Sequence, residues 1–391
     1  MVGPSPGPDQ ELALLCASVD ARRRSAGPRV ELLLAEVDFD LLVATLTQHG
    51  LLELVGSRLA DVWPDRLPPR FQTWVDTAVA KQRYLSLLHQ SLTLSLTQDL
   101  EAGGIPVLPV KGSLLGEAIH GDPAVRPSSD IDLLVAPQDL ERAAQLVERH
   151  GYRSAAVPRT VGGLPEIHLT LLPERVGYPP VELHWRIHWF DTGFSARALA
   201  RSRRDAKRGR VLRLADELCM LALFFARDGF VGLKYPADIA AWWDRYAARV
   251  GEAPLDPALE AHPELRSSLL AASVMLERLV GLEAERLHSP RWRRNLRSRS
   301  ATRLANWPAD GTLEQLVADM SLIDWLLTPR HGQRAFLRRH LAVTHAYGLG
   351  EHSGAGRPLA IVRHDAIGLI KLVYRYARRL RWLRSRLRVS A

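Results

Sequence analysis

Two aspartates, Asp130 and Asp132, open the apolar segment 130–135, whose composition predicts a short β-strand. Side chains alternate between the two faces of a strand, so both carboxylates are expected on the same side. Two carboxylates held together repel each other unless a cation or hydrogen bonds compensate their charge. Mg²⁺ prefers oxygen ligands and often takes one or two carboxylates together with substrate phosphates. The spacing therefore predicts a divalent-cation site at the start of this strand.

Gly112 and Ser113 lie where a predicted strand at 105–110 is followed directly by a predicted helix at 113–121. The free N–H groups at a helix N-terminus favour anions, and a serine hydroxyl adds a further donor. A phosphate site at this turn and a cation site at the aspartates suit one ligand, a metal-bound nucleoside triphosphate.

A third acid, Glu182, follows in a predicted strand at 181–187, fifty residues after Asp132. Phosphoryl transfer with two metal ions benefits from such a carboxylate, which either completes the ligands of the second ion or acts as general base. His184 lies two residues further on the same strand face, where it can orient Glu182 or a substrate phosphate. The other histidines, His168 among them, show no spacing typical of metal ligands and receive no predicted role.

The order of these motifs resembles the nucleotidyltransferase superfamily of the polymerase β type. The matching residues are Gly112-Ser113, a short helix, and Asp130-x-Asp132 at the head of an apolar strand. More narrowly, KGSLLGEAIHGDPAVRPSSDIDLLV and the later VELHWRI resemble a poorly characterised bacterial nucleotidyltransferase family that is sometimes found beside peptide natural-product genes. The resemblance implies that the Gly-Ser turn holds the triphosphate. It also implies that Asp130, Asp132 and Glu182 are catalytic and bind two Mg²⁺ or Mn²⁺ ions.

Further candidates are basic residues near this core and two residues of a later helical segment. Lys111 and Arg126 would add positive charge for the triphosphate or the departing pyrophosphate, although a surface charge or a partner for the neighbouring acids is an equal reading. The resemblance extends more loosely to GLKYPADIAAWW, where relatives have a basic residue and an Asp, here Lys234 and Asp238. These two also suit a structural pair one helical turn apart. The segment CMLALFFARDGF departs from the family, because it lacks the histidines that relatives often place there.

The elements that must position these residues follow from the hydrophobic periodicity. Apolar positions recur at intervals of three and four before the core and again after it, which predicts helices on both sides. In between, two strands alternate with two helices and two more strands follow, so the predicted fold class is α+β with a small mixed-sheet core. The predicted division is a flexible start at 1–10, an N-terminal helical segment at 11–103, the nucleotidyltransferase core at 104–190, a helical domain at 205–350 and a basic amphipathic helix at 360–391.

Composition bounds the class of protein independently of these motifs. Of the 391 residues, 47% are hydrophobic and 24% charged, which is typical of a globular chain and excludes wholesale disorder. The chain has two cysteines, Cys16 and Cys219, and shows neither a signal sequence nor a run approaching the ~20 apolar residues of a spanning helix, so we expect a cytoplasmic protein. The net charge of +9 arises mainly from 371–391, which holds one Lys and seven Arg and leaves 44 basic and 43 acidic residues elsewhere. The basic character therefore belongs to the C-terminal segment and gives no reason to expect nucleic-acid binding by the body.

Together these patterns predict a metal-dependent nucleotidyltransferase that moves a nucleoside monophosphate from an NTP to an acceptor and releases pyrophosphate. The acceptor is open among a peptide natural-product precursor, a small metabolite and tRNA. The alternative is a catalytically degenerate nucleotide-binding module that contacts a partner or a membrane surface through the basic C-terminal helix. The complete set of three acids argues against degeneracy.

Overall fold

The computed structural model describes residues 6–154, 167–305, 313–334 and 336, with the backbone alone over 313–318. Its helices and its five-stranded mixed sheet confirm the α+β fold class. Within these ranges no helix combines the length and the apolar character needed to cross a membrane. The predicted C-terminal helix at 360–391 lies outside the described residues.

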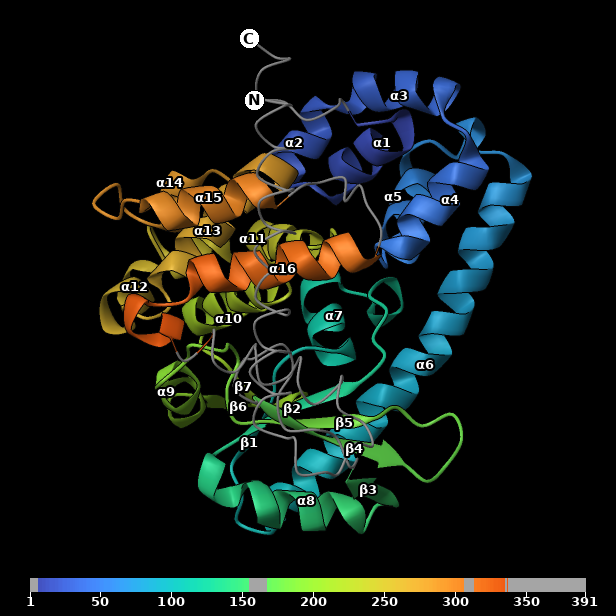
Figure 1. The fold of residues 1–391 in the computed structure, drawn as a ribbon. Helices are drawn as coiled ribbons and strands as arrows, with labels where there is room; N and C mark the ends of the chain where they lie inside the picture. Colours follow the sequence, from blue (N-terminus) through green and yellow to red (C-terminus); the bar gives the residue numbers. More distant parts are fainter. Residues whose placement is uncertain (1–5, 155–166, 306–312, 335, 337–391) are drawn as a thin grey trace, which may run out of the picture.

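The N-terminal helices pack around their own part of the core, and the last of them connects this part to the sheet. The helix α6 is 34 residues long, and in Figure 1 it runs from the N-terminal helices down to the sheet. Helix α1 begins at Pro8, inside the stretch predicted as a flexible start, and Asp9 is buried there. The elements of this part are α1 (Pro8–Ala17), α2 (Asp20–Ser25), α3 (Gly27–Glu36), α4 (Phe39–Gln48), α5 (Leu52–Val62), η1 (Pro64–Arg66) and α6 (Pro69–Ala102).

The sheet has the strand order β1-β2-β5-β4-β3. Its central strands, β2 and β5, are parallel, and every other neighbouring pair is antiparallel. The sequence analysis did not predict β3, which is only three residues long and too short to show a period. The elements are β1 (Val107–Pro109), α7 (Ser113–His120), η2 (Pro123–Val125), β2 (Ile131–Val135), η3 (Pro137–Asp139), α8 (Leu140–Glu148), β3 (Tyr152–Ser154), β4 (His168–Pro173) and β5 (Val181–His184).

The two faces of the sheet differ in chemistry because side chains alternate along each strand. Ile131, Leu133 and Val135 of β2 and Val181 and Leu183 of β5 are buried in one apolar cluster with residues of α6 and α8. Figure 1 shows α8 below the sheet and α7 on the opposite side. The polar residues between these apolar positions therefore face the side of α7 and the later helices.

Helices and one short hairpin make up the regular structure of the described residues after β5. Helices were predicted from 205 onwards, but β6 and β7 form an antiparallel pair across 203–211. The turn is stabilised locally, because the Asp205 carboxylate accepts hydrogen bonds from the N–H groups of Lys207 and Arg208. The elements are α9 (Phe194–Ala200), β6 (Arg203–Asp205), β7 (Gly209–Val211), α10 (Leu214–Arg227), α11 (Lys234–Val250), α12 (Asp256–Ala261), α13 (Arg266–Val280), α14 (Ala284–Leu287), α15 (Leu296–Leu304), α16 (Leu313–Leu327) and η4 (Arg330–Gly332).

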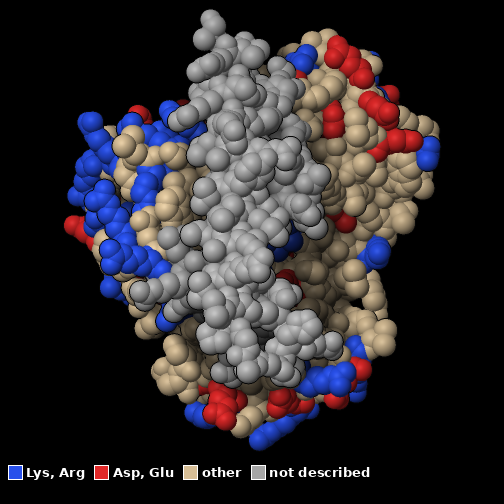
Figure 2. Space-filling model, in the orientation of Figure 1, with Lys and Arg blue, Asp and Glu red and all other residues tan. Residues whose placement is uncertain are grey.

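Helix α10 is the apolar centre of this part. Its residues from Glu217 to Ala226 are all buried, and it packs against α11 and α13. Basic side chains gather instead along the edge of the molecule at the left of Figure 2, on the side where Figure 1 places α14 and α15. Phe224, near the C-terminal end of α10, contacts the ring of His184 on β5. This end of the helix can therefore contribute to a site on the polar face of the sheet.

Candidate active site

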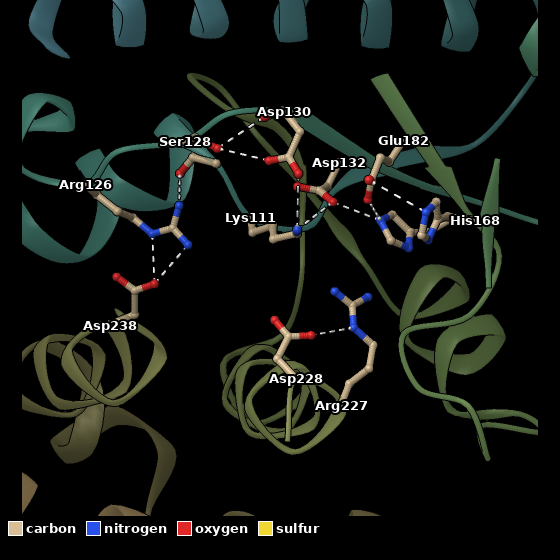
Figure 3. Close-up of polar contacts among 12 residues, drawn as sticks. Lys111, Arg126, Ser128, Asp130, Asp132, His168, Glu182, Arg227, Asp228 and Asp238 are labelled. Carbon is tan, nitrogen blue, oxygen red and sulfur yellow. Dashed lines mark hydrogen bonds and ion pairs between the residues drawn. The ribbon is translucent and has the colours of Figure 1, made fainter. Parts of the chain in front are cut away.

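Three carboxylates meet on the polar face of the sheet. Asp130 directly precedes β2, Asp132 is its second residue, and Glu182 is the second residue of β5. Asp132 and Glu182 are direct neighbours in the parallel register of the two strands. One oxygen from each of the three acids lies within 4.8 Å of the others. The structure therefore brings together the three acids that the sequence analysis selected (Figure 3).

Asp132 is the buried centre of this group, with only 2% of its surface exposed. Its Oδ1 lies 2.8 Å from Nζ of Lys111 and 2.8 Å from Nε2 of His184. Burial alone would raise the pKa of Asp132, but the Lys111 charge and the His184 hydrogen bond hold it well below its usual range. Its second oxygen, Oδ2, is buried and has no hydrogen-bond partner among the described residues. Asp132 is thus ionised and has one oxygen free for a ligand.

The other two carboxylates reach solvent, with side chains that are 23% exposed for Asp130 and 21% for Glu182. Burial and the neighbouring Asp132 charge raise the pKa of Asp130, and Lys111 compensates only in part. For Glu182, burial acts in the same direction, but a hydrogen bond from His184 outweighs it and lowers the pKa. The two partly exposed acids mark the side from which a ligand can approach Asp132.

Lys111 is the cation that the protein itself places among the acids. Its ammonium group lies 2.8 Å from Asp132 and 3.8 Å from Asp130, and it also stands 5.2 Å above the ring of Phe224. Burial would lower the pKa of Lys111, but the Asp132 charge outweighs this and raises it. A permanently charged Lys111 therefore neutralises one of the three negative charges and leaves two.

The Gly-Ser turn has the backbone that the sequence analysis expected of a phosphate site. Gly112 precedes α7 with φ +83°, a backbone conformation that residues other than glycine rarely adopt. Ser113 is the first residue of the helix, and only 3% of its surface is exposed. The first N–H groups of a helix have no acceptor within it, so this N-terminus can bind an anion.

The buried side chain of Arg126 holds the backbone of this turn in place. Its guanidinium donates to the Gly112 carbonyl at 3.2 Å and forms an ion pair with the Asp238 carboxylate at 2.9 Å. The close fit depends on Gly116 of α7, because a Cβ there would stand 3.0 Å from Cβ of Arg126. Arg126 is only 3% exposed, so water screens little of the attraction between its charge and the Gly112 carbonyl.

Asp238 and Lys234 both lie at the start of α11 but do not pair with each other as the alternative reading proposed. The carboxylate of Asp238 instead binds Arg126 and, at 3.3 Å, the ring of His120. Burial raises the pKa of Asp238, but the Arg126 charge outweighs it and lowers the value. Burial, followed by the Arg126 charge, lowers the pKa of Lys234 to about 8. Arg126 becomes the partner because it packs against Gly116 of α7, and α7 in turn packs against α11.

Two residues beside the acids received no role from the sequence. His168 lies opposite His184 in the antiparallel pairing of β4 and β5, and its Nε2 is 3.7 Å from Glu182. Arg227, the last residue of α10, points toward the carboxylates in Figure 3 and pairs with Asp228 at 3.0 Å. Its Nη1 is buried without a partner in the described part of the chain. In the sequence, Arg227 is marked only by its position at the end of an apolar segment. Its place beside the acids follows from the packing of α10 near the sheet, which the sequence pattern does not show.

The group of acids fits a hard divalent cation. It presents oxygen ligands from three carboxylates, carries more negative charge than Lys111 neutralises, and includes the unpartnered Oδ2 of Asp132. Such an ion would be held by Asp130, Asp132 and Glu182, next to the Gly-Ser turn.

An α+β fold with clustered carboxylates beside a glycine-serine turn is the arrangement expected of a nucleotidyltransferase. A protein-family model described as an uncharacterised nucleotidyltransferase matches residues 35–281, which include all three acids. Since this match covers more than half of the chain, the protein belongs to that family. The comparison with curated proteins gives no match.

Proposed function

We propose that this protein transfers a nucleoside monophosphate from an NTP to a hydroxyl group of an acceptor and releases pyrophosphate. In this reaction the acceptor oxygen forms a bond to the α-phosphorus. The bond from that phosphorus to the oxygen bridging to the β-phosphate breaks, and the acceptor proton passes to a base. The family supports an NTP as substrate. The acceptor stays open among a peptide natural-product precursor, a small metabolite and tRNA.

The observation that carries this proposal is the group of three carboxylates with a surplus of negative charge beside the N-terminus of α7. The N–H groups of that N-terminus and the Ser113 hydroxyl would hold the β- and γ-phosphates. Lys111 and Arg227 would neutralise the charge that develops on the departing pyrophosphate, since both are fixed cations in a buried setting. Arg126 and Asp238 would hold the turn in place rather than touch the substrate.

Glu182 is the proposed base at the acceptor side. Its carboxylate is ionised, because the His184 hydrogen bond lowers its pKa, and it reaches solvent, where an acceptor can enter. Divalent ions bound by the three acids, Mg²⁺ or Mn²⁺, would supply charge stabilisation for the triphosphate and acidify the acceptor hydroxyl. The protein itself would hold the triphosphate at the Gly-Ser turn and the acceptor at Glu182, and both groups lie on the polar face of the sheet.

The test is label transfer from each α-labelled NTP in a cell extract that contains acceptors, with Mg²⁺ or Mn²⁺. The wild-type protein should yield a labelled product and pyrophosphate, and the Asp130→Ala/Asp132→Ala variant should yield neither. Asp139→Asn is the matched control, because this acid pairs with Arg142 at the start of α8, on the opposite side of the sheet. Equal label transfer by the wild type and the double variant would refute the proposal.

A further inference from the structure

Two histidines and one carboxylate form a second ligand set beside the three acids. His168 and His184 are directly opposite each other on β4 and β5, and their ring centroids are 4.9 Å apart. Glu182 lies two residues before His184 and therefore shares its strand face. One ligand atom from each of the three residues lies within 4.8 Å of the others.

The distances within this set fit a metal site after a small movement of one ring. Nε2 of His184 is 3.2 Å from Oε2 of Glu182 and 2.8 Å from Oδ1 of Asp132, which hydrogen bonds from this nitrogen explain, and a bound ion would take the place of its proton. Nε2 of His168 is 3.7 Å from Oε1 of Glu182, which is too long for one. Bonds of 2.0–2.2 Å to one metal ion place its ligand atoms about 3.0 to 3.5 Å apart. A small inward movement of His168 would therefore complete such a site, whereas hydrogen bonding alone leaves this imidazole without a hydrogen-bond partner among the described residues.

We propose that His168, Glu182 and His184 bind a first-row transition-metal ion of the Zn²⁺ type. Two imidazole nitrogens and one carboxylate are typical of zinc and related ions, whereas ligand sets of oxygen alone suit Mg²⁺. The site goes beyond the proposed function, which requires only the oxygen ligands of Asp130, Asp132 and Glu182. Glu182 belongs to both sets, and its Oε1, the oxygen that faces His168, is the ligand for this ion, which leaves Oε2 for the function proposed above.

The two sets differ in charge as well as in ligand type. The set of three acids contains two residues, Asp130 and Asp132, that repel each other and attract a hard cation. The histidine set has a single carboxylate, and imidazole ligands add no negative charge, so this set carries less negative charge than the three acids. The metal specificity of the protein would therefore be divided between neighbouring positions on one sheet face.

The test uses untagged, full-length, metal-free protein titrated with Co²⁺ in excess Mg²⁺, because Co²⁺ reports its ligands in the visible spectrum. The wild type should bind one Co²⁺ that Zn²⁺ displaces and Mg²⁺ does not. His168→Gln should weaken Co²⁺ binding at least about tenfold, the lower end of what even the loss of a second-shell partner costs a metal site. Asp130→Asn should retain the Co²⁺ site.

His150→Gln is the matched control, because His150 also forms a close pair with one carboxylate, Asp99 at 2.8 Å, but belongs to no group of three metal-ligating side chains in the described part of the chain. This variant should bind Co²⁺ like the wild type. Equal Co²⁺ affinity in the wild type and His168→Gln would overturn the inference, as would complete displacement of Co²⁺ by Mg²⁺. These outcomes are independent of label transfer: Co²⁺ binding through His168 without turnover would leave this inference standing and refute the proposed function, and the reverse result would do the opposite.

Discussion

Two groups of charged side chains lie near the Gly-Ser turn, and their charges are compensated to different degrees. The carboxylate group comprises Asp130, Asp132, Glu182 and their one close ammonium, Lys111. The arginine-aspartate group comprises Arg126 and Asp238, with His120 as a further hydrogen-bond partner. In the first group acids outnumber bases by three to one, whereas in the second the two full charges cancel.

This difference separates a ligand site from a support. A buried ion pair whose remaining hydrogen bonds are satisfied needs no ligand, and Arg126 in addition donates to the Gly112 carbonyl. The carboxylate group is incomplete, because negative charge remains after Lys111 is counted and Oδ2 of Asp132 is left without a described partner. Proximity of charges is common to both groups, and only the lack of compensation in one of them points to a bound cation.

The largest expected effect is on turnover in the carboxylate group. Asp132→Asn should lower the turnover of labelled NTP at least about a thousandfold, or ~4 kcal/mol in the activation barrier, because it removes the central ligand charge. Steady-state kinetics on protein with a native circular-dichroism spectrum would check this. Turnover within tenfold of the wild type would mean that the carboxylate group, like the arginine-aspartate group, supports the structure and does not bind the catalytic ions.

The next effect is on stability in the arginine-aspartate group. Asp238→Asn should reduce the free energy of unfolding by about 3 to 5 kcal/mol, because it leaves Arg126 buried without its counter-charge. Urea denaturation would measure this loss. The double variant Arg126→Met/Asp238→Leu should recover much of the stability, since removing both charges removes the uncompensated one. Unchanged stability of Asp238→Asn together with lost turnover would instead make this group part of the catalytic machinery.

Asp130→Asn should raise the free energy of unfolding, whereas Asp238→Asn should lower it. The pKa of Asp130 is raised in the folded protein, so its ionised form opposes folding at pH 7, and the variant should unfold at a higher temperature in metal-free buffer. Its advantage should fade as the pH falls through the raised pKa, where the wild-type carboxyl is neutral. At a hundredfold excess over its dissociation constant, Mn²⁺ should stabilise the wild type by about 2.7 kcal/mol and the variant by much less. Thermal melts with and without Mn²⁺ test both statements, and identical metal effects would contradict them.

The last effect is spread over a range of pH and concerns Lys234, which lies next to the compensated group. Its pKa of about 8 is below the ordinary value of 10.5, so the unfolded chain binds a proton more readily than the native protein over this range. The free energy of unfolding should therefore rise between pH 8 and 10.5, with a slope from this residue of at most about 1.4 kcal/mol per pH unit. Lys234→Met should remove this part of the pH dependence. Parallel stability curves for the variant and the wild type would contradict the assigned environment of Lys234.

The sequence by itself determined the local parts of the site. Strand alternation placed Asp130 and Asp132 on one face and Glu182 and His184 on one face, because the direction of a side chain follows from its position in the strand. The order of a glycine, a serine and an amphipathic segment was sufficient to predict the turn and α7, since a helix start depends on neighbouring residues. The same motifs indicated the nucleotidyltransferase family that the family model shows.

Only the tertiary structure decided which of these parts meet. The parallel pairing of β2 with β5 sets Asp132 beside Glu182, the antiparallel pairing of β4 with β5 sets His168 opposite His184, and the packing of α7 on α11 gives Asp238 to Arg126 rather than to Lys234. Strand pairing and helix packing depend on how apolar surfaces from distant segments are buried together, which the local period of a segment does not encode. For this reason the acids could be selected from the sequence, whereas His168, Arg227 and the support of the turn required the fold.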